Sequence, residues 1–519
     1  MQFSRAKSPA VLFLSLSLLA WMGASSAWAQ RPTAEPGTVL LNPEGVVNVQ
    51  DLPRVGPRVP VHREMPFRVP DLQELVDTKA RHQAATQPAP SASAGVTTSA
   101  LTTPSTTTSL MGLRRSESGG WIPPDTQVGV GPSYIVEAVN LEMRIWNRTT
   151  GEVTTSDLNS FFGTSAQLSD PKIRFDPLSN RWFIAVISYN TSFTAGAWRV
   201  AVSTGPDPFS FIRYTASTSK SAPDFPALGI SADKVILTAN AFRGNSFLGT
   251  EFLVINKANL TAGTNATSSY FAPPQGLFTI QPAHSLSSTA TLYMAAVAYN
   301  SATSIRVWSV NGVPGVGAGV TRSTKDVPIT SLTSPPDARQ AGTSTLIQTN
   351  DNRLLDAAYR NDVLWVSANS ACVPLGDTTT RACLRLIQLS IGSSITKTQD
   401  FDFGQSGSYY YYPAVQIDGN GNLISVFSGS SASLWAGVYA SGQRPADGPN
   451  TFQLPATIKF GENAYKPFAN RWGDYSCASI DPSNSATIWV AGEYAHIEGG
   501  SEWGTWIAPL QMLPPSPSP

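Results

Sequence analysis

A pair of short apolar strands joined by a tight turn recurs seven times between Trp121 and Met512, and this recurrence limits the possible folds more than any other feature. The second strand of each copy is the more apolar, and the turns use Gly, Asn, Asp, Ser and Pro, which preset or tolerate turn dihedrals. A third strand follows each copy. In chain order, copies one to seven occupy residues 126–140, 172–188, 227–240, 283–300, 354–369, 414–429 and 477–494.

A sheet of three or four strands repeated in this way is typical of a β-propeller, in which the sheets form blades around a central channel. A β-helix would need shorter and stricter repeats, and a β-sandwich gives no reason for one hairpin to recur. We therefore predict an all-β protein with a β-propeller over residues 120–512, with seven four-stranded blades as the first choice and six or eight as alternatives. The last copy ends soon after its third strand, so we expect residues 38–49 or 108–122 to supply its fourth.

The first 29 residues predict a signal peptide. Arg5 and Lys7 precede a short apolar run, and Ala27-Trp28-Ala29 fits the small-residue cleavage pattern. We therefore expect an exported protein, either secreted to the exterior or periplasmic. No later segment has the roughly 18 consecutive apolar residues that a membrane-spanning helix needs.

Residues 30–119 are expected to form a largely disordered N-terminal segment and linker. Within them, residues 86–110 are rich in Pro, Ser and Thr and carry no charge, as flexible linkers do. Two shorter stretches have structural potential, a strand pair over 38–49 and a short helix over 70–85. The alternative to local structure in these two stretches is that the whole segment is a disordered stalk or pro-segment. A disordered tail is expected over 513–519.

Composition excludes several classes of protein. Only 13% of the residues are charged, against a usual fraction of about 25%, which suits an extracellular all-β protein with many turns. The net charge is zero and there is no basic run, so we expect no nucleic-acid partner. Three cysteines are too few for a disulfide-built scaffold, so the core must come from ordinary apolar burial. We expect a monomer.

The cysteines and one histidine invite specific hypotheses. Cys372 and Cys383 flank a hairpin loop in copy five, and in an exported protein we expect them to form a disulfide. Cys477, at the start of an inner strand, is interpreted as a buried small residue, with a nucleophile as the alternative. His284 heads the inner strand of copy four, where it could face the channel or simply pack. There is no HxH or HExxH pair, so no histidine metal site is predicted.

The candidate site lies where the chain enters the innermost strands, because these entry points converge at one end of a propeller's channel, here called the mouth. Counting back five or six residues from the end of each inner strand gives one candidate for most copies. These are Asp125, Asp170, Asp224, Arg353, Tyr411 and Asp474, with Gln281 or His284 for copy four and with Arg471 and Trp472 beside Asp474.

Three interpretations of these residues remain open. The aspartates could cap turns by accepting backbone N–H bonds, which is a structural role. They could bind a glycan, whose hydroxyls suit carboxylates and whose ring faces suit aromatic side chains; a Ca²⁺ ion held by several carboxylates is a variant. Two of them could act as acid and nucleophile or base in glycoside cleavage, with one pKa raised by burial. A lyase using His284 with Tyr411 or Tyr412 is a weaker version.

The stretch DPKIRFDPLSNRWFIAVIS (170–188) and its sister repeats resemble the blade pattern of secreted sialidase-like and arabinanase-like propeller enzymes, which place acidic residues on inner strands. The Asp-box of sialidases, S-x-D-x-G-x-T-W, is missing, and no arginine triad can be assigned. The stretches PPDT (123–126) and RWGDYS (471–476) also resemble bacterial exported propeller proteins to which no activity attaches. The resemblance implies a fold and suggests glycans as ligands.

The sequence therefore predicts that an exported propeller binds a glycan or another surface polymer at its mouth. A glycan-cleaving enzyme is the alternative, with Asp125, Asp170, Asp224 and Asp474 as its catalytic candidates, and a protein-interaction scaffold is the third option. No cofactor is predicted, and a Ca²⁺ ion is the alternative. The predicted binding residues are Asp125, Asp170, Asp224, His284, Arg353, Tyr411, Arg471, Trp472 and Asp474.

Overall fold

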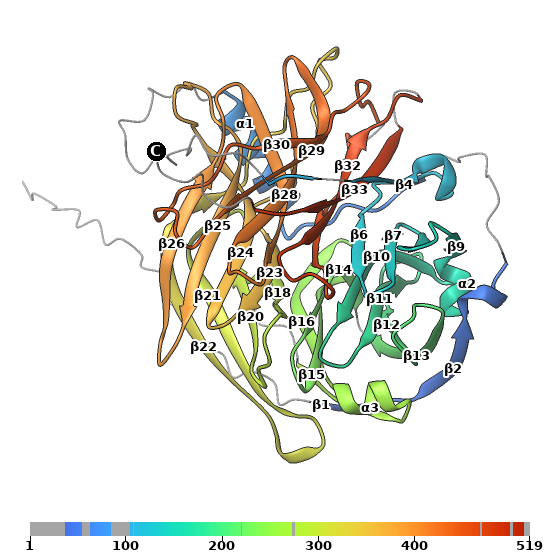
Figure 1. Cartoon of the computed structure of the whole chain (residues 1–519). Coiled ribbons are helices and arrows are strands. Elements are labelled where there is room, and N and C mark those ends of the chain that lie inside the picture. Colours follow the sequence, from blue (N-terminus) through green and yellow to red (C-terminus); the bar gives the residue numbers. More distant parts are fainter. Residues whose placement is uncertain are drawn as a thin grey trace, which may run out of the picture. The chain divides into compact units, whose positions relative to one another are not determined.

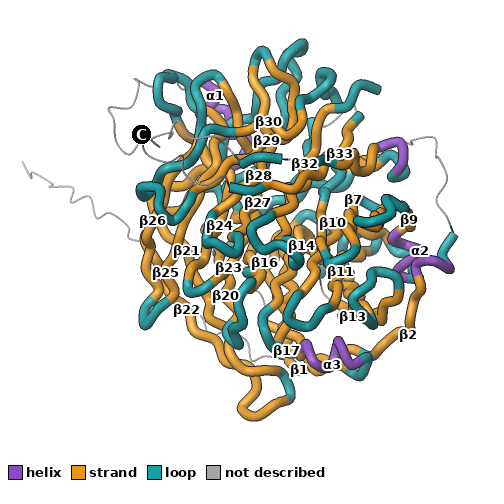
Figure 2. The backbone as a smooth tube through the Cα atoms, in the orientation of Figure 1, coloured by secondary structure: helices purple, strands orange, loops and turns teal. Residues whose placement is uncertain are grey.

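Antiparallel strand meanders make up most of the structure, a computed structural model (Figures 1 and 2). It describes residues 37–53, 63–84, 104–106, 108–218, 221–271, 276–467, 470–498 and 502–512. The predicted signal peptide, the tail and most of the predicted linker lie outside these residues. No helix among the described residues is long and apolar enough to cross a membrane.

Five sheets are separate antiparallel blades of four or five strands, which confirms the all-β propeller fold. The first strand of each blade is the first strand of one sequence copy. The blade of copy one contains β6 (Gln127–Val130), β7 (Tyr134–Val139), β8 (Glu142–Asn147) and β9 (Val153–Asp157). That of copy two contains β10 (Gln167–Asp176), β11 (Arg181–Tyr189), β12 (Gly196–Ser203), β13 (Ser210–Thr218) and β2 (Pro43–Asn48).

The other three separate blades belong to copies four, six and seven. Copy four forms β18 (Phe278–Pro282), β20 (Leu292–Val297), β21 (Ser301–Val313) and β22 (Val316–Thr333). Copy six forms β27 (Ser408–Ile417), β28 (Leu423–Ser431), β29 (Leu434–Gln443) and β30 (Ala456–Lys459). Copy seven forms β31 (Cys477–Ile480), β32 (Ile488–Ala495) and β33 (Trp503–Leu510), with β4 (Leu110–Arg114) beside them.

Copies three and five share one ten-stranded sheet, so the prediction of seven separate blades is wrong and five are separate. The link is β19 (His284–Ser285), which pairs in parallel with a strand of each copy. The first strand of copy four is interrupted after Pro282, whose nitrogen has no hydrogen to donate, and the chain then continues as β19. The sheet contains β14 (Ala222–Ile230), β15 (Lys234–Arg243), β16 (Ser246–Asn256), β17 (Ala266–Phe271), β23 (Leu354–Arg360), β24 (Val363–Cys372), β25 (Arg381–Ile391), β26 (Ile395–Phe403), β19 and β1 (Gly37–Leu41).

The N-terminal segment supplies strands to four sheets, so the expectation of disorder does not hold for its described residues. β1 pairs with β17 and β2 with β13, rather than with each other as a strand pair. β4 pairs with β33 and occupies the fourth-strand position of copy seven. Between them lie β3 (Arg63–Glu64), paired with β5 (Trp121–Ile122), and α1 (Leu72–Ala84). Short helices α2 (Leu158–Phe162) and α3 (Lys257–Ala262) follow β9 and β16.

One backbone device recurs at the entry to the first strands. Three asparagines near the ends of second strands bond the next copy: the Oδ1 atoms of Asn140, Asn240 and Asn369 accept the backbone N–H of Asp170 (2.9 Å), Thr279 (2.9 Å) and Tyr412 (2.6 Å). These three bonds tie neighbouring copies together at the mouth. The entry residues have positive φ, a conformation that Asn and Asp tolerate better than most. They are Asp125, Asp170, Phe225, Thr279, Asn350, Tyr412 and Asn470, with φ between 51° and 59°.

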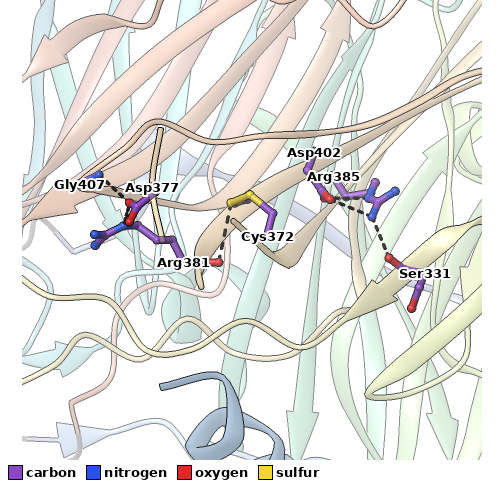
Figure 3. Close-up of a disulfide and its surroundings, with 8 residues drawn as sticks. Ser331, Cys372, Asp377, Arg381, Arg385, Asp402 and Gly407 are labelled. Carbon is purple, nitrogen blue, oxygen red and sulfur yellow. Dashed lines mark hydrogen bonds and ion pairs between the residues drawn. A yellow bond between two sulfur atoms is a disulfide. The ribbon is translucent and has the colours of Figure 1, made fainter. Parts of the chain in front are cut away.

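The predicted disulfide is confirmed. Cys372 and Cys383 are bonded, with their Cα atoms 5.9 Å apart, where β24 leads into β25 (Figure 3). The loop that they close is fixed further by Asp377, which pairs with Arg381 and accepts the backbone N–H of Gly407 at 2.9 Å. The disulfide and the carboxylate of Asp377 together fix the loop between the second and third strands of copy five.

Candidate functional site

The structure brings most of the predicted site residues together at the mouth. Asp474 donates its backbone N–H to the carboxylate of Asp125 at 2.8 Å, and its own carboxylate pairs with Arg471 at 2.9 Å. Asp170 accepts the hydroxyl of Tyr475 at 3.1 Å. Arg353 and Asp224 complete the group, which we call the mouth cluster: Asp125, Asp170, Asp224, Arg353, Arg471 and Asp474.

Three of the four aspartates of the mouth cluster are buried. Asp125, Asp170 and Asp474 are 0%, 7% and 8% exposed, whereas Asp224 is half-buried. The second oxygen of Asp125 accepts the side-chain amide of Asn140 at 2.7 Å, and Asp474 accepts that of Asn350 at 3.1 Å. Asp125 and Asp474 therefore already hold donors from the protein on both oxygens, as a structural role requires.

Burial and mutual repulsion favour the neutral forms of several acids at the mouth. Burial, together with the charges of Asp474 and Asp170, raises the pKa of Asp125 well above its ordinary value. Burial and the charge of Asp170 raise the pKa of Asp224 to about 7, although Arg353 and Arg68 oppose that shift. Proton occupancy of Asp224 therefore changes within the physiological pH range.

Arg353 balances much of this negative charge. Its guanidinium makes a two-pronged pair with Asp351, at 2.9 Å from Nε and 2.7 Å from Nη2, and both side chains are almost fully buried. Its planar face lies between two rings, 4.3 Å from the centroid of Phe225 and 4.5 Å from that of Phe278. The two parallel hydrogen bonds of this pair fix the orientation of the guanidinium, in addition to the attraction between the two charges.

Four other predicted residues do not join the cluster. Tyr411 is buried and donates to Ser430 at 3.1 Å, and Tyr412 takes the entry position of copy six instead. The first strands of copies two, three, four and six share a bulge at this point, and in copy six Tyr412 rather than Tyr411 has the positive φ that Asp170 has in copy two. Trp472 is buried and donates to Ser428 at 2.9 Å, which is a packing role.

His284 and Gln281 also lie outside the cluster. His284 is buried in β19, and burial, followed by the charge of Arg174, lowers its pKa to about 3. An uncharged imidazole in a bridging strand fits the structural interpretation rather than the lyase hypothesis. The side chain of Gln281 donates to the carbonyl of Leu354 at 3.1 Å.

The sequence analysis missed the segment that lies on the mouth, residues 63–84, which we call the strap. The guanidinium of Arg471 lies 5.1 Å from the ring centroid of Phe67. The charge of the neighbouring Arg68 acts on Asp224 across the mouth. Phe67 thus contacts one member of the mouth cluster, whereas the guanidinium of Arg68 donates to the carbonyl of Gly244 at 3.2 Å and lies over the ring of Phe193.

The strap is anchored on both sides of these two residues. Before them, Met65 donates its N–H to Ile122 at 2.7 Å; after them, Val69 and Leu75 pack against Phe242 and Phe278. Polar contacts hold α1 in place as well. They are the ion pair Lys79–Asp337 (2.7 Å) and the bonds from Asn300 to Thr78 (2.9 Å) and from Tyr299 to Asp71 (2.6 Å).

One sequence signal could have marked the strap. The stretch PFRVP, residues 66–70, places Phe67 and Arg68 between two prolines, which favours an extended backbone. It directly precedes the helix expected over 70–85, which the structure forms as α1. An extended aromatic–cationic pair before a helix is a reasonable candidate for a segment that docks on an acidic site.

A pocket of about 560 Å³ lies near the strap on the sheet of copy two. The hydroxyl of Tyr189, one of its lining residues, also contacts the sulfur of Met65 at 3.7 Å. Most of its lining side chains carry hydroxyl, amide or guanidinium groups. They include Gln167, Ser188, Asn190, Arg199, Thr215 and Ser217.

Neither a metal centre nor a reactive cysteine stands out. Among the described residues, no group of three or more His, Cys, Asp or Glu side chains is arranged to hold a metal ion. Cys477 is buried; its sulfur lies 3.3 Å from Nη1 of Arg174 and 3.4 Å from the carbonyl of Val128. These contacts suit the interpretation of Cys477 as a packed inner-strand residue.

Comparison with known proteins gives structural neighbours only. No protein-family model matches the sequence, and no curated protein matches it. The α-L-arabinanase of Penicillium chrysogenum, solved with arabinobiose, is 10% identical with a TM-score of 0.39, covering 79% of this chain and 99% of the enzyme. The GH93 α-L-arabinofuranosidase of Fusarium graminearum is 8% identical with a TM-score of 0.38, covering 75% and 92%. The β-propeller domain of the trilobed protease from Pyrococcus furiosus is 8% identical with a TM-score of 0.36, covering 73% and 93%.

Proposed function

We propose that this protein is an exported β-propeller that binds a glycan or another polar surface polymer at its mouth, and that the strap covers this site in the present structure. The observation that carries the proposal is the position of Phe67 and Arg68. The Phe67 ring lies against the guanidinium of Arg471, and the positive charge of Arg68 acts on the carboxyl of Asp224 without forming an ion pair with it. Because the mouth already holds one polymer segment, the strap, it can also hold a segment of a different polymer after the strap has left.

A glycan offers groups that match this site. Release of the strap would free the half-buried carboxyl of Asp224, the guanidinium of Arg471 and the place of the Phe67 ring. Sugar hydroxyls donate to carboxylates and accept from guanidinium groups, and sugar rings present apolar faces to aromatic surroundings. The hydroxyl-lined pocket on copy two offers further polar contacts along an extended ligand.

Binding is better supported than cleavage. A glycosidase needs two carboxyl groups on either side of the scissile bond, with access for substrate and water. At the mouth, Asp125, Asp170 and Asp474 are buried, and only Asp224 is half-buried. Even with the strap displaced, Asp125 and Asp474 would keep their donors from Asn140, Asn350 and Arg471.

The test is a glycan array probed with three full-length proteins: wild type, Arg68→Ala, and Arg68→Ala combined with Asp224→Asn. We expect Arg68→Ala to bind at least one glycan more tightly than wild type, because the strap competes less well for the mouth. The double variant should lose that gain. Release of reducing ends from the bound glycan is assayed in parallel and is expected to stay at background.

Equal binding by all three proteins would place the ligand elsewhere, and no binding by any of them would refute the proposal in favour of a protein-interaction scaffold. Reducing-end release by Arg68→Ala that disappears when Asp224→Asn is added would establish the hydrolase instead. Thermal unfolding of each variant shows whether it is folded under the array conditions.

The titration of Asp224 makes a separate prediction about stability. Because its pKa is raised to about 7 in the folded protein, the native state keeps a proton between about pH 4 and pH 7 that the unfolded state has lost. Stability contributed by this group therefore falls as the pH rises through that window. Asp224→Asn cannot ionise, so its melting temperature relative to wild type should be higher at about pH 8 than at about pH 5.

The matched control is Asp326→Asn. Asp326 is exposed, and its hydrogen bond with Arg306 lowers the pKa of its carboxyl, so Asp326 is ionised at both pH values. Its effect on the melting temperature should therefore be the same at both. A difference for Asp224→Asn that does not change with pH would contradict the raised pKa.

A further inference from the structure

A second pocket, of about 270 Å³, lies between copies five and six. It is bounded by the turn from β23 to β24, which contains Arg360 and Asn361, and by the turn from β27 to β28, which contains Gly421. The mouth residue Arg353 directly precedes the opposite end of β23, and Tyr412 lies in the middle of β27, away from this turn. The pocket is therefore separate from the mouth and from the strap.

Strand register explains which side chains form its walls. Trp365, Gln388 and Gln399 stand directly opposite one another on β24, β25 and β26, so their side chains form a row across one face of the sheet. Val363 lies two residues from Trp365 and shares that face. The facing wall is the corresponding row of copy six, Ile417, Leu423 and Gln443.

Three glutamines lock the two walls together. Gln399 and Gln443 exchange amide hydrogen bonds of 3.1 and 2.9 Å between the sheets. Gln399 also donates to Oε1 of Gln388 at 2.6 Å, and the hydroxyl of Thr398 donates to the same oxygen at 3.0 Å. The orientation of Gln388 is fixed in this way, and its Nε2 group has no bond to any described residue.

Arg360 adds a cation that forms no ion pair with any described residue, although the negative charge of Asp418 acts on it from a greater distance. Its Nε donates to the carbonyl of Ile417 at 3.2 Å, which fixes the guanidinium, while its two terminal nitrogens bond no described residue. The other arginine of the pocket, Arg444, is already paired with Asp447 at 3.1 Å. A half-buried guanidinium with both terminal donors free is matched in geometry by a carboxylate.

We infer that this pocket binds a small carboxylate-bearing ligand through the guanidinium of Arg360 and the side-chain amide of Gln388. The rings and branches of Trp365, Ile417 and Leu423 supply apolar walls for the body of the ligand. The volume lies just below the range of pockets for drug-sized ligands, which suits a body of a single ring. The ligand is either a hydroxylated acid, such as a uronic acid, or a less polar cyclic acid.

Calorimetric titration of the full chain tests the inference, with glucuronate, cyclohexanecarboxylate and neutral glucose as probes. At least one of the two carboxylates should bind saturably and glucose should not, and the tighter carboxylate identifies the ligand body. Arg360→Met should weaken binding about 10- to 100-fold, because charged hydrogen bonds to a buried partner are lost. Arg360→Lys should retain part of the affinity, since it keeps the charge but not the fork.

Gln388→Glu should abolish binding, because the new carboxylate repels the carboxylate of the ligand and competes with it for Arg360. Arg306→Met, which removes an exposed arginine on β21, is the control and should bind as wild type does. The inference is overturned if neither carboxylate binds wild type, if glucose binds equally well, or if Arg360→Met keeps full affinity. These outcomes do not depend on the strap variants, so they are distinguishable from a failure of the proposed glycan site.

Discussion

A chain that begins at Gly120 is expected to lose more than about 5 kcal/mol of unfolding free energy, which is comparable to the whole stability of many domains. The truncation removes seven buried apolar side chains, each contributing roughly 1.5–3 kcal/mol before the cost of ordering the segment. It also removes β4, so that β33 becomes an open edge and Glu137 loses the backbone N–H of Leu113 (2.9 Å). The seven are Leu41, Val47, Val49, Met65, Val69, Leu75 and Leu113.

Denaturant unfolding followed by tryptophan fluorescence measures the effect. The control is a chain that begins at Gly37, which keeps every described residue and should unfold at the same denaturant concentration as the full chain. If the chain from Gly120 proves as stable as this control, then β1, β2, β4 and the strap do not contribute to the stability of the propeller.

Arg353→Met is expected to cost about 3–5 kcal/mol, the second large effect. Methionine fills a similar volume but leaves the carboxylate of Asp351 buried with no cation, and it removes the positive charge that most strongly opposes the raised pKa of Asp224. Most of this cost comes from the uncompensated acid rather than from lost attraction. Adding Asp351→Asn to Arg353→Met should therefore recover part of the stability.

Arg306→Met provides the comparison for this prediction. Arg306 makes an equally short two-pronged pair with Asp326, both contacts being 2.7 Å, but the two side chains are 30% and 51% exposed. Exposed pairs contribute less than about 1 kcal/mol. Similar losses of unfolding free energy for Arg306→Met and Arg353→Met would show that burial does not control the strength of the mouth cluster.

The fold could be predicted from local features because each copy carries its own evidence. Apolar strands and turn residues such as Asp176-Pro177 and Asn361-Asp362 mark the hairpins without reference to the rest of the chain. The merging of copies three and five could not be predicted in the same way. It depends on two residues, His284 and Ser285, that pair with strands distant in sequence.

The site was predictable to the extent that it follows from the repeat. Asp125, Asp170, Asp224 and Asp474 converge because they stand near equivalent strand entries, and counting back from the strand ends found them. Counting stopped one residue short of the positive-φ entry position at Asp224, where Phe225 holds it, and at Tyr411, where Tyr412 holds it. A bulge at this point is common to the first strands of copies two, three, four and six.

The strap was out of reach of this reasoning for a different reason. Its docking depends on interactions of Phe67, Arg68 and Lys79 with residues about 160–400 positions away along the chain, and no local periodicity indicates such interactions. The burial of Asp125, Asp170 and Asp474 was equally hidden, because a sequence shows that acids converge but not what covers them.

Hydrogen–deuterium exchange of the strap, measured on the full chain with and without the glycan selected by the array, tests the central claim most directly. If the strap and the glycan compete for the mouth, the amides of residues 63–70 should exchange faster when the glycan is bound, while those flanking Asp224 should exchange more slowly. A glycan that binds while strap exchange stays unchanged would contradict the account, because the strap would then not be the cover of the binding site.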